Sequence, residues 1–290
     1  MRQRTWGSRA FDAANGLVLL LVAVITVLPF IFVLSGSLVS SEELLVRKIV
    51  LFPTKFSLDA YRFLFSTKII SSSLGITVFI TVVGTLINLA VTTLMAYPLA
   101  RKTLRGRGKI MLMIVITMLF SGGMIPTYLV VKNLGLLDTY WSLWIPSAIS
   151  AFNLILLKNF FQQLPDGLEE SAKIDGCNDL QILYKIVIPL SLPAMATFAL
   201  FYAVGHWNSY FTAILYLNDT KMWPIQVWLR QIVLLSSGGF TDAGTVAEMS
   251  VPPQSIKYAV IVVAAVPILL LYPFLQKHFA KGVLLGSVKG

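Results

Sequence analysis

Six long apolar stretches constrain this chain of 290 residues more than any other feature of its sequence. A helix needs about 20 apolar residues to cross the hydrocarbon core of a bilayer. The stretches lie at about 16–38, 69–100, 110–131, 140–157, 190–217 and 258–275, and none contains Lys, Arg, Asp or Glu. The sequence therefore predicts an all-α, polytopic membrane protein with six transmembrane helices.

Composition supports a membrane protein and excludes several other classes. Hydrophobic residues make up 57% of the chain and charged residues 12%, whereas a soluble domain is about 45–50% apolar and about 25% charged. These values exclude a disordered chain, a coiled coil and an ordinary soluble enzyme. With one cysteine, Cys177, no disulfide within the chain can form. Two histidines and one cysteine are too few for a dedicated zinc centre, so we expect no metal site.

The basic residues follow the predicted membrane topology. The loop Arg101–Lys109, after the second stretch, has five basic residues among nine and no acidic residue. Because Lys and Arg near the ends of spans favour the cytoplasmic side, we expect this loop and, with six spans, both termini to be cytoplasmic. That topology places 14 of the 23 basic residues inside and 9 outside. The net charge of +10 therefore reflects membrane orientation and does not indicate nucleic-acid binding.

The chain is expected to consist of five consecutive segments. They are a cytoplasmic N-terminal segment at 1–15, a first transmembrane helix at 16–38, an external loop at 39–68, a five-helix core domain at 69–281 and a cytoplasmic tail at 282–290. The external loop and a second one at 218–257 are long enough for short helices and a docking surface. Plain solvated connectors are the alternative, and the sequence favours neither.

The most informative segment is the predicted cytoplasmic loop at 164–189, which has the signals of two short helices separated by a bend. Asp166 is expected to cap the first helix, with Glu169 three residues on completing a capping box. Gly176 suits the left-handed position that ends such a helix. Asn178 or the aspartate after it can cap the next one. We therefore predict a rigid, sharply bent element here.

This loop resembles the conserved cytoplasmic loop of ATP-binding-cassette (ABC) importer permeases. That pattern is Glu-Ala-Ala, three residues, Gly, nine residues, Ile, one residue and Leu-Pro. The matching positions here are Glu170, Ser171, Ala172, Gly176, Ile186, Ile188 and Pro189. The spacing agrees at every step. Ser171 replaces the middle alanine and Ile188 replaces leucine, and both keep a roughly suitable size or polarity.

The resemblance extends from about residue 71 to 281 and implies the fold of a type I ABC importer transmembrane domain. The chain end at 272–290 and the pair Asp175-Gly176 resemble the carbohydrate branch. The overall sequence resembles permeases for complex oligosaccharides, such as aldouronate and pectin- or alginate-derived sugars. Such a permease works with a second homologous permease, two ATPase subunits inside and an extracytoplasmic solute-binding protein. The implied function is ATP-driven import by alternating access across the cytoplasmic membrane of a prokaryote.

In that family the loop forms a coupling helix that sits in a groove on the ATPase. The residues carried over to this role are Glu170, Ser171, Ala172, Asp175, Gly176, Ile186 and Pro189. The chain has no Gly-x-x-x-x-Gly-Lys-Ser/Thr sequence, so it lacks the backbone cradle that binds nucleotide phosphates. We therefore expect no cofactor in this chain, with ATP and Mg²⁺ bound by the partner ATPases. No residue is predicted to be catalytic, and the chain is expected not to be an enzyme.

Polar residues within the apolar stretches indicate the substrate path, because they are costly in a membrane and mark function. The densest cluster lies at 206–210 in the fifth stretch. The path candidates are Asn153, His206, Trp207, Asn208 and Tyr210. For Asn88 we favour pairing between helices. We expect His206 to be a hydrogen-bonded interior residue and not a metal ligand.

Two further features concern the shape and position of the helices. The segment 121–128 contains adjacent glycines and Pro126, and it predicts a distorted third helix that lines a cavity or packs tightly. Trp141 and Trp144 are expected in the aromatic belt at the membrane surface.

Two other kinds of transporter remain open on the sequence. A permease for amino acids, peptides or a metal chelate would have the same loop motif. A secondary carrier would need no ATPase, but proton coupling in such a carrier usually requires acidic residues within the membrane. The apolar stretches contain none, which counts against this alternative.

Overall fold

The computed structural model describes residues 6–47, 50–236 and 252–287. In these ranges the chain is helical, and the one strand-like pairing found in them is an antiparallel bridge between Val39 and Phe56. The predicted all-α class is confirmed. The chain divides into two compact units, residues 1–70 with 229–266 and residues 71–228 with 267–290. The segment boundaries expected from the sequence stay a prediction.

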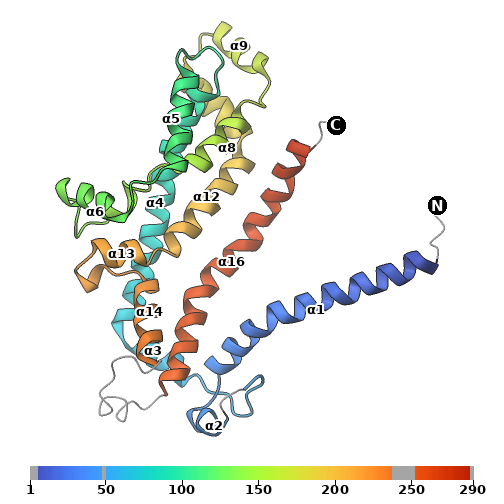
Figure 1. The fold of residues 1–290 in the computed structure, drawn as a ribbon, viewed down its shortest axis with the longest axis vertical. Coiled ribbons are helices and arrows are strands. Elements are labelled where there is room, and N and C mark those ends of the chain that lie inside the picture. Colours follow the sequence, from blue (N-terminus) through green and yellow to red (C-terminus); the bar gives the residue numbers. More distant parts are fainter. Residues whose placement is uncertain (1–5, 48–49, 237–251, 288–290) are drawn as a thin grey trace. The chain divides into compact units, whose positions relative to one another are not determined.

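The first unit contains three helices from the start of the chain and the first part of the last helix. They are α1 (Trp6–Ser37), α2 (Ser41–Val46), α3 (Asp59–Ser66) and α16 (Pro253–Ser287) (Figure 1). The end of α1 packs closely on α16. A Cβ on Gly36 would lie 2.5 Å from the ring of Tyr258, and that ring lies 5.5 Å from the ring of Phe32 between centroids. Only glycine permits this approach, whereas the preceding apolar turns of α1 are exposed, as expected of a helix in lipid.

The predicted external loop is ordered around one carboxylate, that of Glu43. Its oxygens accept hydrogen bonds from the backbone N–H of Thr54, at 3.0 and 3.2 Å, and from that of Lys55, at 3.1 Å. Nearby, the hydroxyl of Ser35 donates to the carbonyl of Leu51 at 2.6 Å. The helices α2 and α3 confirm that this loop contains short helices. Its use as a docking surface stays a prediction.

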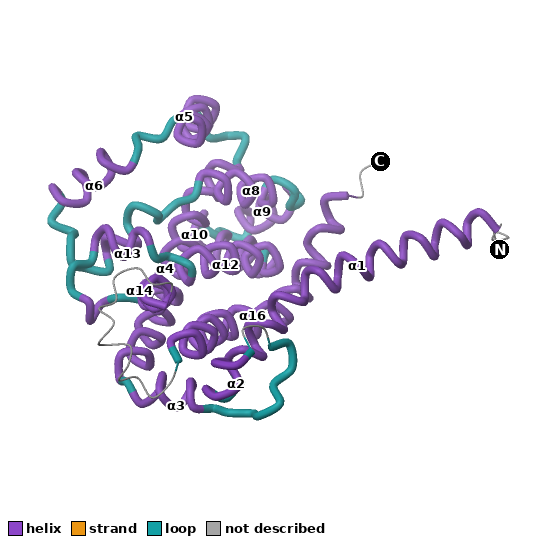
Figure 2. Tube along the Cα trace, turned by 60° about the horizontal axis from the view of Figure 1, so that its bottom comes forward, coloured by secondary structure: helices purple, strands orange, loops and turns teal. Residues whose placement is uncertain are grey.

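The second unit contains the helices that follow, which Figures 1 and 2 show from two directions. They are α4 (Lys68–Ala100), α5 (Arg107–Leu119), α6 (Met124–Asn133), α7 (Trp141–Trp144), α8 (Ala151–Phe161), α9 (Asp166–Ile174), α10 (Asp179–Ile182), α11 (Ile188–Leu190), α12 (Leu192–Trp207), α13 (Phe211–Tyr216) and the start of α14 (Ile225–Ser236). A π-helical turn, Leu183–Val187, joins α10 to α11. A 3₁₀ turn, Thr220–Met222, precedes α14.

Among the described residues, three helices are long and apolar enough to cross a membrane. These are α1, α4 and the 253–270 part of α16. Two bent pairs would each add one crossing: α5 with α6, at 115°, and the 179–190 helix with α12, at 84°. The first bend falls between α5 and α6, within the segment predicted to be distorted, and confirms that distortion.

The fourth apolar stretch, 140–157, folds as the two helices α7 and α8. Pro146 lies between them, and proline cannot donate a backbone hydrogen bond to continue a helix. Ser150 then starts α8 by accepting the N–H of Asn153 at 3.4 Å. A proline and nearby hydroxyls therefore interrupt a stretch whose apolar composition alone suggests one helix.

Two apolar clusters hold the second unit together. One surrounds the C-terminal end of α4 and joins it to α5, α8, α9, α10 and α12, several of which lie next to one another in Figure 2. The other surrounds the first half of α4 and joins it to α7 and α13. Trp144 belongs to the second cluster, where its Nε1 donates to the carbonyl of Ile80 at 3.2 Å. The expected belt position is therefore wrong for Trp144, which is buried, while Trp141 is exposed.

Candidate coupling element and transport path

The predicted bent loop is present as α9, a turn at Gly176 and α10. The start of α9 differs from the prediction. Pro165 occupies the N-cap position with an extended backbone, φ −59° and ψ 126°, and Asp166 is already the first helical residue. The N-cap residue is the one that needs extended dihedrals, and proline supplies them here. The predicted capping role of Asp166 is therefore wrong, and Glu169 is used elsewhere.

The end of α9 has the predicted geometry. Gly176 has a φ of +80°. Its N–H donates to the carbonyl of Lys173 at 3.0 Å, and the N–H of Cys177 donates to that of Ala172 at 2.9 Å. These two bonds form a Schellman motif, which fixes the direction in which the chain leaves the helix. A side chain at this left-handed position would cost about 1–2 kcal/mol.

The second half of the loop is a short helix with its own cap. Asn178 and Gln181 form a capping box, with hydrogen bonds of 2.8 and 2.9 Å, which identifies Asn178 as the cap among the two candidates. Ile182, Leu183 and Val187 are buried and hold the helix on the core. The π-helical turn that begins at Leu183 is the kind of irregularity found often at functional sites.

The seven residues carried over to the coupling role lie on two faces of this element. Ala172 is 6% exposed and packs with Ile182 and Leu183 in the chain's own core. Ile186 is half-buried against the same cluster. The remaining five are exposed: Glu170, Ser171, Asp175, Gly176 and Pro189. One face of the motif therefore anchors the element, and the other is open to a partner.

A salt bridge joins α9 to the end of α4. Arg101 directly follows α4, pairs with Glu169 and lies over the ring of Tyr97, with its guanidinium carbon 4.4 Å from the ring centroid. The Arg101 and Glu169 side chains are only 19% and 22% exposed, so water screens the pair weakly. Beside it, Nε2 of Gln162 donates to the carbonyl of Ala100 at 3.1 Å. These contacts connect α9 and the end of α8 to α4.

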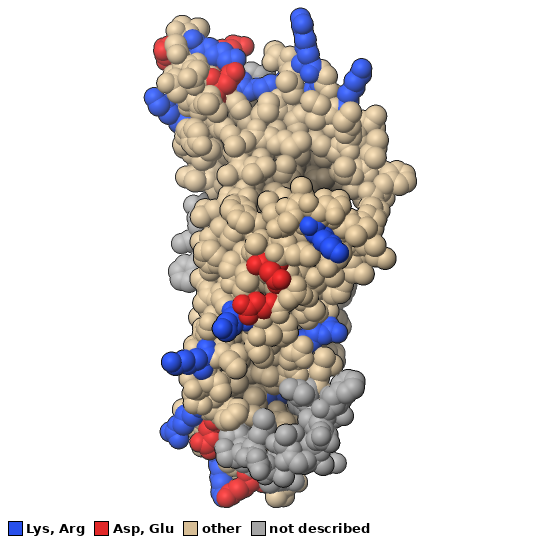
Figure 3. Space-filling model, turned by 90° about the vertical axis from the view of Figure 1, so that its left-hand side faces the viewer, with Lys and Arg blue, Asp and Glu red and all other residues tan. Residues whose placement is uncertain are grey.

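The charged side chains of this end are visible in Figure 3. Lys, Arg, Asp and Glu gather at the end of the second unit that carries α9, and the surface directly below them is uncharged. Ordinary membrane helices show this change at the border of the hydrocarbon layer.

The polar cluster of the fifth stretch is partly a structural link. Nε2 of His206 lies 2.5 Å from Oδ1 of Asn88, and Nδ2 of Asn88 donates to the carbonyl of Ser147 at 2.5 Å. A Cβ on Gly84 would lie 2.5 Å from the His206 ring, so glycine makes room for it. The link joins α12, α4 and the connection between α7 and α8. The expected pairing of Asn88 and the expected interior hydrogen bond of His206 are both confirmed.

The other path candidates differ in exposure. Asn153 and Trp207 are buried, Tyr210 is half-buried, and Asn208 is exposed where α12 ends. Asn208 and Tyr210 belong to the short connection that leads to α13. The structure therefore brings only part of the predicted cluster to a surface, and the role of these residues in transport stays a prediction.

Comparison with known proteins identifies the family. Residues 86–285 match the family described as "Binding-protein-dependent transport system inner membrane component". This range contains the whole bent element and the last 15 residues of α4. The chain belongs to this family. It is thus a membrane permease subunit of an ABC transporter, as the motif at 170–189 indicates.

Several relatives of the permease cover almost its full length. It is 62% identical to the "Polygalacturonan/rhamnogalacturonan transport system permease protein YtcP" of Bacillus subtilis (strain 168), over 98% of its own chain and 99% of the relative's. It is 55% identical to "Protein LplC" of the same organism, over 99% and 97% of the two chains. A solved structure of a bacterial ABC transporter involved in the import of the acidic polysaccharide alginate contains a chain with 33% identity. That chain superposes with a TM-score of 0.89, over 96% of the permease and 100% of the solved chain.

The bridge between Arg101 and Glu169 is the feature of the permease that sequence analysis missed. The basic loop explained Arg101 as a topology signal, and the capping box explained Glu169. One signal was available: Glu169 and Glu170 are adjacent on a helix, and neighbouring helical residues do not share a face. The two carboxylates therefore point in different directions, so only one of them needs to face a docking partner and the other is available for a contact within the chain.

Proposed function

We propose that the permease forms one half of the pathway of an ATP-driven importer for an oligosaccharide derived from pectin or alginate. The second half is a second, homologous permease, and the two work by alternating access. The name of the relative with 62% identity supports a pectin-type cargo. The import function of the transporter with 33% identity supports the alginate alternative.

The observation that carries the proposal is the two-faced bent element. Ala172 anchors α9 on the core while Glu170, Ser171 and Asp175 remain exposed on a helix with a fixed end. A rigid helix with an open polar face suits docking into a groove of a separate ATPase. In this proposal the ATPases bind ATP and Mg²⁺ and perform the hydrolysis, and the permease transmits the resulting movement.

The contacts behind α9 suggest how the movement reaches the pathway. The bridge from Glu169 to Arg101 attaches α9 to the end of α4, and the bond from Gln162 to Ala100 attaches the end of α8 to the same place. Closure of the two ATPases would therefore move these helix ends as one rigid body. The buried link through Asn88 and His206 joins α4 to α12 further along the unit, so that α12 follows.

The sugar path is proposed to pass the end of α12. Sugars are bound by aromatic faces and by amide and hydroxyl groups, and Asn208 and Tyr210 offer both kinds at a surface. His206 and Trp207 are buried beside them and would hold the end of α12 in place. Asn153, also buried, would act in the same indirect way.

The proposed orientation places α9, the loop Arg101–Lys109 and both termini in the cytoplasm. The ordered loop around Glu43 is then external. It would receive the solute-binding protein that delivers the sugar. The excess of basic residues in the inner loops supports this orientation.

Purification of the tagged permease in mild detergent tests the proposal. We expect a second six-span permease and an ATPase to co-purify, and we expect Glu170→Lys to lower the ATPase yield while the permease stays in the membrane. A permease that is recovered alone and still takes up sugar after ATP depletion, with ion gradients clamped, would overturn the proposal in favour of a secondary carrier.

The path assignment has its own test. Asn208→Ala is expected to change sugar uptake and sugar-stimulated ATP hydrolysis without changing the amount of assembled complex. The control is Ser8→Ala, which also replaces an exposed polar residue by alanine, but on α1 and far from Asn208 in the sequence. An Asn208→Ala complex that keeps the normal dependence of ATP hydrolysis on sugar would remove Asn208 from the path.

A further inference from the structure

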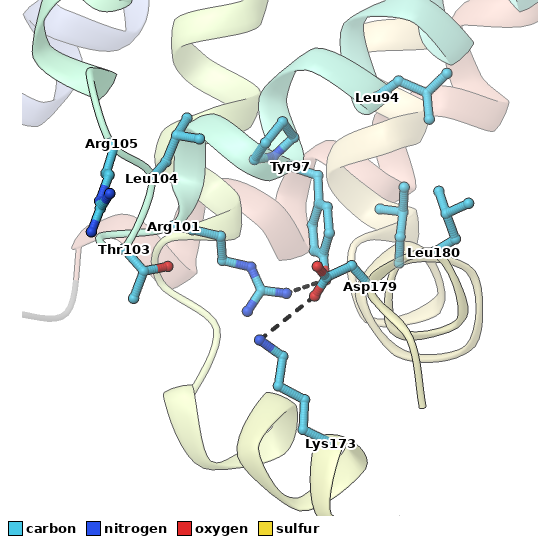
Figure 4. Close-up of a pocket in the computed structure, with 11 residues that line it drawn as sticks. Leu94, Tyr97, Arg101, Thr103, Leu104, Arg105, Lys173, Asp179 and Leu180 are labelled. Carbon is cyan, nitrogen blue, oxygen red and sulfur yellow. Dashed lines mark hydrogen bonds and ion pairs between the residues drawn. The ribbon is translucent and has the colours of Figure 1, made fainter. Parts of the chain in front are cut away.

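A cavity of about 450 Å³ lies beside the C-terminal end of α4. Its walls come from α4, from the loop that follows α4, from α9 and from α10. Figure 4 draws the eleven lining residues and labels nine of them. The volume falls in the range of about 300–1,000 Å³ that is usual for small-molecule sites. None of the contacts proposed above for the ATPase or the sugar requires it.

One part of this cavity is basic. Arg101, Arg105 and Lys173 line it together with the carboxylate of Asp179, and Arg101 also pairs with Glu169, which lies outside the lining. Lys173 lies 3.6 Å from Asp179, and in Figure 4 the Arg101 guanidinium and the Lys173 ammonium lie close together beside it. A guanidinium has five donors and an ammonium three, so the bonds they already make leave donors for an anion. The hydroxyl of Thr103 adds a further polar group.

The other part of the cavity is apolar and open. Leu94 and Leu180 line it and are 49% and 60% exposed, and Figure 4 shows the two on the same side. Leu94 lies six residues before the end of α4, about 9 Å along the helix axis. Since α4 is long and apolar enough to cross a membrane, this side of the cavity belongs to the membrane-spanning part of the unit.

We propose that this cavity binds an anionic phospholipid, with the phosphate between Arg101, Arg105 and Lys173 and the start of an acyl chain along Leu94 and Leu180. The arrangement matches the ligand in both charge and polarity. Basic pockets between membrane helices bind anionic headgroups in this way. The lipid would bridge α4 to α9. It would therefore stabilise the position of α9, the element proposed to couple the permease to its ATPase.

A water-soluble anion fits the cavity less well than a lipid does. Such an anion could occupy the basic part, but it would leave Leu94 and Leu180 in water. An acidic segment of the ATPase is a second alternative, and it too offers nothing apolar to Leu94 within the span. The lipid is the occupant that satisfies both parts of the cavity.

The test measures lipid retention by the intact importer, whatever sugar it carries. The permease, its partner permease and the ATPases are purified together, and native mass spectrometry counts the phosphatidylglycerol that remains bound as it is titrated into the micelles. We expect Arg105→Gln/Lys173→Gln to weaken this binding about 30-fold, because each basic group near a membrane surface changes the affinity for an anionic lipid about fivefold. Phosphatidylcholine, which has no net charge, should show no difference between the variants.

Matched controls separate this site from general surface charge and from a soluble-anion site. Lys109→Gln/Lys185→Gln removes the same charge from two exposed lysines outside the cavity and should leave binding within about twofold. Glycerol 3-phosphate, the headgroup without acyl chains, should not compete. An equal loss in the control pair, or full competition by glycerol 3-phosphate, would overturn the proposal.

A second variant covers the case in which the charge variants fail to assemble. Leu180→Trp keeps every charge and fills the open mouth of the cavity, so it should lower phosphatidylglycerol retention in an assembled complex. Unchanged retention in this variant would overturn the lipid assignment. If Leu180→Trp instead releases the ATPase without affecting the lipid, the cavity belongs to the ATPase interface and the proposal is wrong.

Discussion

The permease has two pairs of adjacent glutamates that can be compared directly, Glu42-Glu43 in the external loop and Glu169-Glu170 in α9. In each pair one carboxylate turns inward and the other stays exposed. Glu43 accepts backbone hydrogen bonds within its loop, whereas Glu169 pairs with Arg101. Glu42 forms a surface ion pair, and Glu170 is exposed on the face open to a partner.

The two inward carboxylates differ in what they require from the rest of the sequence. The partners of Glu43 are backbone N–H groups only 11 and 12 residues away, and any residue other than proline supplies such a group. Glu169 needs one particular side chain, Arg101, 68 residues earlier in the chain. The external loop is therefore held by local geometry, whereas the attachment of α9 depends on a specific long-range pair.

The largest effect is expected from reversing the exposed charge of α9. Glu170→Lys should lower sugar uptake by about tenfold or more, because in the proposed assembly this charge faces the ATPase, and a like charge across an interface costs several kcal/mol. Uptake of labelled sugar into cells or vesicles, normalised to the amount of permease in the membrane, measures this. Lys109→Glu, a charge reversal on the same side but outside α9, is the control. Normal uptake by the Glu170→Lys variant would contradict the coupling role proposed for Glu170.

The second prediction concerns the inward carboxylate of the same pair. Glu169→Ala should lower the free energy of unfolding of the purified permease by about 1.5–3 kcal/mol, the usual value for losing a hydrogen bond to a charged group. Uptake should fall as well, because α9 loses its salt bridge to the end of α4 and is held there by apolar packing around Ala172. Thermal unfolding in detergent and sugar uptake measure the two effects.

Exchange of the two partners separates a specific pair from general charge. Arg101→Glu/Glu169→Arg should recover much of the stability and uptake that each single variant loses, and the double-mutant cycle gives the coupling directly. If the exchanged pair is as impaired as the sum of the single variants, then Arg101 and Glu169 act independently and the comparison between the two glutamate pairs fails.

Sequence reasoning succeeded where the determining groups are neighbours in the chain. The left-handed Gly176 and the cap at Asn178 depend on residues within a few positions. Gly176 was predicted, and Asn178 was one of the two predicted caps, although its capping box with Gln181 was not. Asp166 was assigned wrongly because Pro165 competes for the same N-cap position and has suitable dihedrals. The bend between α5 and α6 was also predicted, since its glycines lie at the bend itself.

Sequence reasoning failed where the partner is distant. Arg101 meets Glu169 and Asn88 meets His206 only after the helices pack. The residues next to each of them in the sequence do not indicate which partner it will have. Trp144 was assigned to the membrane surface because it lies near the outer end of the predicted fourth span. The break at Pro146 and the core around Ile80 place it inside instead.

A smaller effect is expected in the external loop. Glu43→Gln keeps one oxygen acceptor but removes the charge that strengthens the bonds from Thr54 and Lys55, so hydrogen exchange of these two amides should become severalfold faster. Glu42→Gln removes only a surface ion pair, which contributes little, and it should leave the two amides unchanged. Equal effects of the two variants would mean that Glu43 does not hold these two amides more strongly than Glu42 does.

The smallest effect is the pH dependence of the same bonds. The backbone hydrogen bond from Lys55 is the main cause that lowers the pKa of Glu43 below its usual value of 4.5, with Thr54 and Arg47 adding to it. Because the folded pKa is the lower one, the contribution of Glu43 is complete above the usual value and is lost as the pH falls through the folded pKa. Amide protection at 54 and 55, corrected for intrinsic exchange, should therefore hold at neutral pH and decline in acid in the wild type. In Glu43→Gln, which cannot titrate, the same protection should stay constant. A wild-type profile as flat as that of the variant would show that the carboxylate does not hold the loop.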